Sequence, residues 1–186
     1  MQIADAQADL RRTYRRGGVG QIVTGLVWAA AAAAATWGSL GLPVPVLFVG
    51  GVLIFPLTTL GLRLIGGPAA LPKGHPLGQL AFLSAIQAPL GLLVAVALAA
   101  LSPQLFLPAA MLLIGAHYLP FAFLYGMRAY LALAVPMIAG GLLIGWLAPG
   151  LGVTGAWASA ALLVGFGAWA LAGARREPEG RPAAAS

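Results

Sequence analysis

The stretch from residue 78 to residue 101 reads GQLAFLSAIQAPLGLLVAVALAAL and decides the fold class, because it contains no charged side chain. A helix of about 20 apolar residues is long enough to cross the ~30 Å hydrocarbon core of a bilayer. Comparable apolar stretches recur along the chain, and the predicted spans are residues 18–38, 43–63, 78–101, 105–125, 129–148 and 153–173. The sequence therefore predicts an all-α integral membrane bundle of six transmembrane helices.

The composition supports this class. The chain has 186 residues, of which 61% are hydrophobic and 8% charged, whereas soluble domains carry about 25% charged residues. It has no cysteine, which excludes disulfides, thiolate nucleophiles and cysteine-ligated metal clusters. We expect one transmembrane domain at residues 18–173, with a cytoplasmic leader at residues 1–17 and a disordered cytoplasmic tail at residues 174–186.

The basic residues predict the orientation of this domain. Every Lys and Arg falls before the first span, after the second, after the fourth or after the sixth, and so on one side of the membrane. The opposite connections, near residues 39–42, 102–104 and 149–152, carry no charge. Because Lys and Arg accumulate in cytoplasmic loops, both termini are predicted to be cytoplasmic, in a cell inner (plasma) membrane. The net charge of +6 then reflects orientation, and we expect no nucleic-acid partner.

The leader predicts a short amphipathic helix. Ile3, Ala6, Leu10 and Tyr14 recur at nearly helical spacing, which is typical of a helix lying on the membrane interface. A frayed, solvated leader is the alternative. A signal peptide is disfavoured, because the first apolar stretch exceeds the 7–15-residue core of such peptides and further spans follow.

His117 is the polar residue that the sequence singles out. It lies inside the fourth predicted span, where an ionisable group needs a partner or water. Pro120 follows one turn later and predicts a kink, and Ser84 and Gln87 precede Pro89 in the third span at a similar depth. These features predict either a polar cavity open to the cytoplasm or a packed contact in which a neutral histidine stabilises the kink. The candidate solute or polar-network residues are Ser84, Gln87, His117 and Tyr118, with Arg63, Tyr125 and Arg128 at the rim.

Several classes of function are disfavoured. No Asp or Glu lies in a span, and ion-coupled transport usually needs such a carboxylate. Two histidines without an acidic partner argue against a metal site. We also find no nucleophile or acid–base pair, and we therefore expect no enzymatic activity and no cofactor. The GxxxG motif at Gly141 and Gly145 suits packing within one chain as well as a homo-oligomer, so the oligomeric state stays open.

Two motifs carry a resemblance to a known family. The first is Gly115-Ala116-His117-Tyr118-Leu119-Pro120, continued by Leu124-Tyr125 and Ala129-Tyr130, and the second is Lys73-Gly74-His75-Pro76-Leu77-Gly78. They resemble bacterial multi-pass membrane proteins of domain-of-unknown-function family 7010. His75 stands where that family is expected to carry asparagine. The resemblance implies a bacterial membrane protein and supplies no reaction.

Two hypotheses follow from these observations. The first is a membrane protein, embedded in the lipid bilayer, that binds or passes a small neutral or anionic solute through the cytoplasm-facing cavity. In it, His117 and Gln87 contact the solute, and Arg63 or Arg128 attracts negative charge. The second is an accessory or regulatory subunit whose arginines and leader helix dock a partner protein or anionic lipid.

Overall fold

The computed structural model describes residues 2–176, which form helices joined by turns and by one longer connection at residues 65–77, and contain no strand. The helices are α1 (Ile3–Thr13), α2 (Gly18–Trp37), α3 (Pro43–Leu64), α4 (Gly78–Leu101), α5 (Phe106–His117), α6 (Leu119–Leu124), α7 (Leu131–Leu147) and α8 (Gly152–Ala174). Short 3-10 turns lie at Arg15–Gly17, Pro103–Leu105, Arg128–Tyr130 and Pro149–Leu151. Within this part of the chain, six helical segments are long and apolar enough to cross a membrane. The predicted six-helix membrane bundle is confirmed, and the predicted tail lies, from residue 177 on, outside the described residues.

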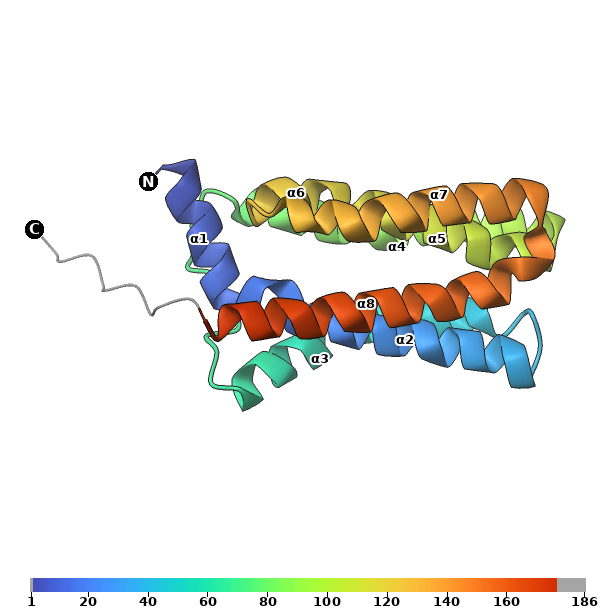
Figure 1. Ribbon diagram of the computed structural model, residues 1–186, viewed down its shortest axis with the longest axis horizontal. Helices are drawn as coiled ribbons and strands as arrows, with labels where there is room; N and C mark the ends of the chain where they lie inside the picture. The colour runs from blue at the N-terminus through green and yellow to red at the C-terminus, as the bar shows by residue number, and fades with distance from the viewer. Residues whose placement is uncertain (1, 177–186) are drawn as a thin grey trace, which may run out of the picture.

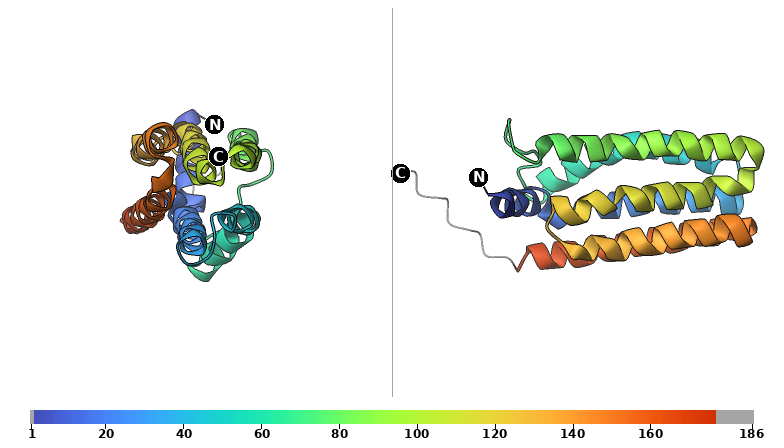
Figure 2. Two further views of the ribbon diagram at one scale, coloured as in Figure 1. Left: turned by 90° about the vertical axis from the view of Figure 1, so that its right-hand side faces the viewer. Right: turned by 90° about the horizontal axis from the view of Figure 1, so that it is seen from above.

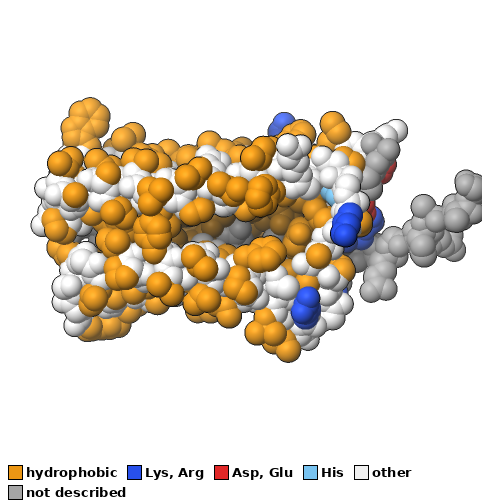
Figure 3. All heavy atoms as spheres, turned by 180° about the vertical axis from the view of Figure 1, so that it is seen from behind, with side chains coloured by type: hydrophobic (Ala, Val, Ile, Leu, Met, Phe, Trp, Pro, Cys, Tyr) orange, Lys and Arg blue, Asp and Glu red, His pale blue; other side chains and the backbone are white. Residues whose placement is uncertain are grey.

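The spans form two layers (Figure 1). The helices α2, α3 and α8 make one layer, and α4, α5, α6 and α7 make the other, as the end-on view of Figure 2 also shows. Helix α2 packs against α8 and α3, and α5 packs against α7 and α4, whereas α3 and α4 have little contact with each other. Figure 3 shows that the face opposite to that of Figure 1 is largely apolar and is hollowed between the two layers.

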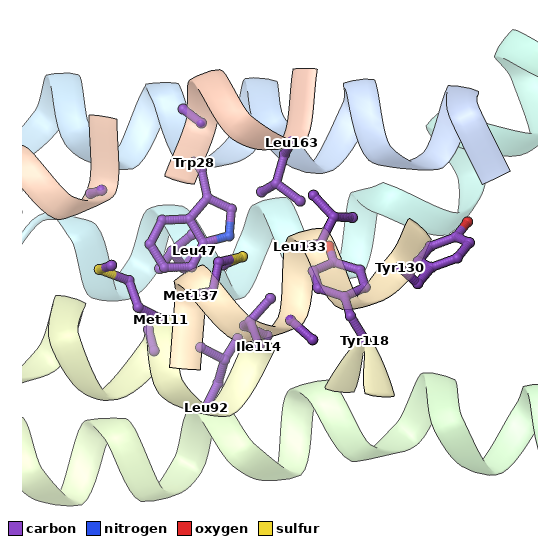
Figure 4. Close-up of a cluster of buried hydrophobic side chains, with 14 of the residues drawn as sticks. Trp28, Leu47, Leu92, Met111, Ile114, Tyr118, Tyr130, Leu133, Met137 and Leu163 are labelled. Atoms are coloured by element: carbon purple, nitrogen blue, oxygen red, sulfur yellow. The ribbon is translucent and has the colours of Figure 1, made fainter. Parts of the chain in front are cut away.

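The buried core lies between the layers (Figure 4). Trp28 of α2 is 1% exposed and projects toward α5 and α7. Apolar side chains from both layers surround it, among them Leu47, Leu92, Met111, Ile114, Leu133, Met137 and Leu163. In lipid no hydrophobic force drives helices together, so close backbone approach and packing hold such a bundle.

Glycines allow α2 and α8 to approach closely. A Cβ atom on Gly18 would lie 2.7 Å from the backbone oxygen of Gly167, and a Cβ on Gly167 would lie 2.7 Å from the backbone oxygen of Gly18. Any side chain at either position would push the two helices apart. This reciprocal contact fixes the α2–α8 pairing.

The fourth span is interrupted at Tyr118. Helix α5 ends at His117, and α6 begins at Leu119 with Pro120 in its first turn. The Tyr118 N–H donates to the Gly115 carbonyl at 3.1 Å, three residues back rather than four. Proline cannot donate a backbone hydrogen bond and crowds the preceding turn, so the helix breaks where the sequence predicts a kink.

The basic residues of the described chain gather at one end of the bundle, here called the basic end (Figure 3). Helix α1 lies across this end, from α6 in one layer to the start of α2 in the other (Figure 1). Its Ala6 and Leu10 are each 1% exposed. The apolar side of the leader helix thus packs on the bundle itself, whereas the sequence placed it on the membrane surface. Ile3 alone of the predicted apolar positions is largely exposed.

Candidate functional site

Buried polar and aromatic side chains gather between the layers toward the basic end. We call this group the inner cluster, and it consists of Gln21, Thr24, Ser84, His117, Tyr118, Tyr125 and Tyr130. Figure 4 shows two of its members, Tyr118 and Tyr130, at one end of the apolar core. All are buried except His117, which is half-buried. Such groups are costly in a membrane interior unless they are hydrogen-bonded, and they mark functional positions there.

Aromatic rings form a continuous series through this cluster. The His117 ring meets Phe121 edge-on, with 4.9 Å between centroids. Phe121 stacks on Tyr125 at 5.9 Å, and Tyr125 stacks on Tyr130 at 5.1 Å. Tyr130 contacts Phe166 of α8 at 5.0 Å. The series therefore joins the broken fourth span to the last span.

Hydrogen bonds connect the cluster to the turn before α2. The Tyr130 hydroxyl donates to the backbone carbonyl of Arg16 at 3.0 Å. The side chain of Gln21 also hydrogen-bonds to the Tyr130 hydroxyl. The Arg16 guanidinium lies 5.0 Å from the ring centroid of Trp169 on α8, within the range of a cation–π interaction.

Two polar atoms of the cluster are buried without a partner. The His117 imidazole donates a hydrogen bond to the backbone carbonyl of Ser84, but its Nδ1 has no partner. Tyr118 and Thr24 share a side-chain hydrogen bond. Gln21, 4% exposed, has no donor for its Oε1. A neutral imidazole that donates through one nitrogen can accept through the other, so both unpartnered atoms are hydrogen-bond acceptors.

Helix α1 closes the basic end above the cluster and contacts the end of α6. The side-chain amide of Gln7 donates to the Phe123 carbonyl at 2.6 Å. The Arg11 guanidinium donates to the Tyr125 carbonyl, also at 2.6 Å. Arg11 is thereby bound to the chain's own backbone, next to a member of the inner cluster.

The other side of α1 contacts the connection between α3 and α4. His75 Nε2 lies 3.9 Å from the Asp9 carboxylate, and the Nδ1 atom of the same ring accepts a hydrogen bond from the Leu77 N–H at 3.2 Å. Burial raises the pKa of Tyr14 above its ordinary value, and a hydrogen bond with the Leu71 backbone partly offsets that increase. Helix α1 thus bridges the two layers.

The structure brings together some of the residues that the sequence selected. Ser84, His117, Tyr118 and Tyr125 belong to the inner cluster, whereas Gln87, Arg63 and Arg128 are exposed. Gln87 lies three residues after Ser84 on α4, but it is exposed whereas Ser84 is buried.

Three members of the inner cluster were not among the residues predicted from the sequence. Gln21 and Thr24 are spaced three residues apart on one face of the first span, a spacing that could have indicated a shared polar surface. Tyr130 lies near the end of a predicted span, where aromatic residues commonly anchor a helix at the membrane interface. The sequence therefore does not indicate that Tyr130 is fully buried.

The comparisons assign the chain to a family. A sequence model for a family of unknown function, DUF7010, matches residues 3–172. The chain belongs to this family. The match confirms the resemblance carried by the two motifs, and it includes both α1 and the inner cluster of this DUF7010 protein. No curated protein and no solved structure matches it.

Proposed function

We propose that this DUF7010 protein binds a small neutral solute at the inner cluster and passes it toward the cytoplasm. The observation that carries the proposal is the pair of buried acceptors, Gln21 Oε1 and His117 Nδ1, which have no partner among the described residues. Buried polar atoms are almost always hydrogen-bonded, so orphaned ones need an explanation. A solute with two or more N–H or O–H donors would satisfy both atoms.

The surroundings favour a neutral solute over an anion. The cluster consists of hydroxyl, amide and imidazole groups between aromatic rings, which suits a compact molecule with a polar edge and an apolar body. The exposed Arg63 and Arg128 lie outside it. Because cationic loops stay in the cytoplasm, we assign the basic end to the cytoplasmic side of the plasma membrane, and the cluster faces that side.

The proposed role is not catalytic. The hydrogen-bond partner of His117 is a backbone carbonyl, which cannot act as an acid, a base or a nucleophile. An imidazole held in this way can orient a hydrogen-bonding solute.

Solute flux and ligand-induced stabilisation test the proposal together. The purified protein in proteoliposomes is challenged with glycerol, urea, acetamide and, as an anion, acetate, and flux is followed by stopped-flow light scattering. Thermal unfolding is measured with the same probes, because a ligand at 100 times its Kd stabilises by about 2.7 kcal/mol. We expect at least one neutral probe to permeate or stabilise, and acetate to do neither.

Two glutamine variants provide the matched comparison. Gln21→Leu removes an amide inside the cluster, and Gln87→Leu removes an exposed amide from another span. The response to the neutral probe should disappear in Gln21→Leu and persist in Gln87→Leu. Loss in both variants, or no response of the unmodified protein to any neutral probe, would contradict the proposal.

A second candidate, docking of anionic lipid, rests on a separate observation. An apolar groove of about 390 Å³ lies between α2 and α3 and is lined by Val23, Leu26, Val27, Ala30, Leu57, Leu60, Gly61 and Leu64. The exposed Arg63 follows Gly61 toward the basic end, and it forms no ion pair in the described part of the chain. An acyl chain in the groove with its phosphate near Arg63 would suit this arrangement. Native mass spectrometry with phosphatidylglycerol and phosphatidylcholine tests it, since Arg63→Gln should abolish any preference for the anionic lipid.

A further inference from the structure

We infer that α1 is a lid over the inner cluster and that it opens by rotation about the turn at Arg15–Gly17. The inference deepens the proposed function, since it concerns access to the same site. It rests on three observations: the backbone of the turn, the contacts that hold the turn, and the kind of contacts that hold α1.

The turn has an unusual backbone. Three consecutive residues have positive φ angles, namely Arg15 at 49°, Arg16 at 58° and Gly17 at 78°. Glycine adopts such angles readily, but the left-handed conformation is unfavourable for residues that carry a Cβ. Residues in such conformations persist only where the surrounding structure holds them, and they concentrate at switches and ligand sites.

The inner cluster itself holds the turn. The Tyr130 hydroxyl donates to the Arg16 carbonyl, and a Cβ on Gly17 would collide with that hydroxyl. Gln21, which carries one of the unpartnered acceptors, hydrogen-bonds to the same hydroxyl. A solute that engages Gln21 or Tyr130 therefore acts directly on the hydrogen bond that fixes the hinge. A ligand shifts a two-state equilibrium when it interacts differently with the two states, and this contact provides the difference.

The contacts of α1 are of a kind that can be exchanged for water. Gln7 and Arg11 donate to the backbone carbonyls of Phe123 and Tyr125. Asp9 approaches His75. The residues that α1 buries are Ala6, Leu10 and Thr13, fewer than α2 or α8 buries, and Tyr14 after the helix is half-buried. Segments with few buried apolar contacts open at low free energy, so α1 can leave the basic end while the six spans stay folded.

The chain has no cysteine, so one introduced thiol reports on the cluster without background labelling. Ser84→Cys is the reporter, because Ser84 is 3% exposed and bonds to His117 through its backbone, which the substitution keeps. The measured quantity is the rate of labelling by a small water-soluble maleimide, in nanodiscs and without solute. Arg176→Cys, at an exposed position at the end of α8, is the control thiol.

Two sets of substitutions should change the labelling rate of Ser84→Cys in opposite directions. Gln7→Ala with Arg11→Ala removes the contacts to α6, and the reporter should label at least tenfold faster. Arg15→Gly should label at least fivefold more slowly than Arg15→Ala, because both variants lose the charge and only glycine removes the backbone penalty. The control thiol should label at the same rate in all of these backgrounds.

The lid would be overturned if Ser84→Cys labelled at the same rate with and without the paired changes Gln7→Ala and Arg11→Ala. Equal rates for Arg15→Gly and Arg15→Ala would also overturn it, and this second comparison still decides the question if the Gln7→Ala, Arg11→Ala protein fails to fold. Since no solute is present, these results do not depend on the proposed function. If the labelling rates change as expected but the protein responds to no neutral probe, solute binding is rejected and the inference that α1 is a lid stands.

Discussion

The contact between α2 and α8 predicts that one methyl group at residue 167 destabilises the bundle. A Cβ on Gly167 would lie 2.7 Å from the backbone oxygen of Gly18 and 2.9 Å from the backbone nitrogen of Ile22. Both neighbours are backbone atoms, so relief requires the helices to separate by roughly 0.5–1 Å, which forfeits a quarter to a half of each dispersion contact along the seam. We expect Gly167→Ala to lower the free energy of unfolding by about 1–3 kcal/mol.

Gly165 supplies the matched control, two residues away on the same helix. A Cβ at Gly165 would have no atom within 4 Å. Only backbone entropy and helix propensity then act, and Gly165→Ala should raise the free energy of unfolding by about 0.5–1 kcal/mol. The same substitution is therefore predicted to have opposite signs at these two positions.

Reversible unfolding in mixed lipid and detergent micelles measures both effects. The fraction of sodium dodecyl sulfate is increased, and the loss of helix is followed by circular dichroism for the unmodified protein and the two variants. Gly167→Ala should unfold at a lower detergent fraction and Gly165→Ala at an equal or higher one. The reasoning is refuted if Gly167→Ala is as stable as the unmodified protein, or if both variants lose the same stability.

The other predictions concern single contacts. His75→Asn should leave hydrogen exchange of the Leu77 amide unchanged, because an asparagine side chain can accept the same hydrogen bond from the amide two residues ahead. His75→Ala should speed that exchange about fivefold. Equal exchange rates in both variants would show that the hydrogen bond does not protect the amide. Tyr130→Phe removes the donor to the Arg16 carbonyl and should lower the free energy of unfolding by about 1–2 kcal/mol in the detergent titration. An unchanged free energy of unfolding would show that this hydrogen bond does not stabilise the protein. Phe106→Ala, at a position with 0% exposure, should cost about 3–5 kcal/mol, and a smaller loss than that of Tyr130→Phe would contradict the packing of α5.

The transmembrane spans were predictable because a helix that crosses the bilayer must be apolar along most of its length. Each span needs a long run without charge, and such runs place all six segments that the structure contains. The break at Tyr118 was also predictable, since Pro120 acts on its own helix through local geometry. The packing partners of each helix were not predictable, because most faces of these spans are uniformly apolar. Their sequences therefore show no periodicity that would indicate which face is packed.

The candidate site was predictable only in part for the same reason. His117 is conspicuous in any apolar span, but Gln87 and Gln21 look alike in the sequence. Only the packing of α4 and α2 distinguishes them, by leaving one amide exposed and enclosing the other. The docking of α1 on the bundle also depends on carbonyl groups at the end of α6, which no side-chain pattern reveals.

The pairing of α2 with α8 also bears on how the chain is assembled. Helix α2 packs most extensively against α8, which is synthesised after the four spans between them, so the glycine face of α2 stays against lipid until α8 inserts. Gly18 and Gly25, which contact α8, find their partner only at that point. A nascent chain that stops before α8 therefore presents an unpaired α2 surface to the membrane.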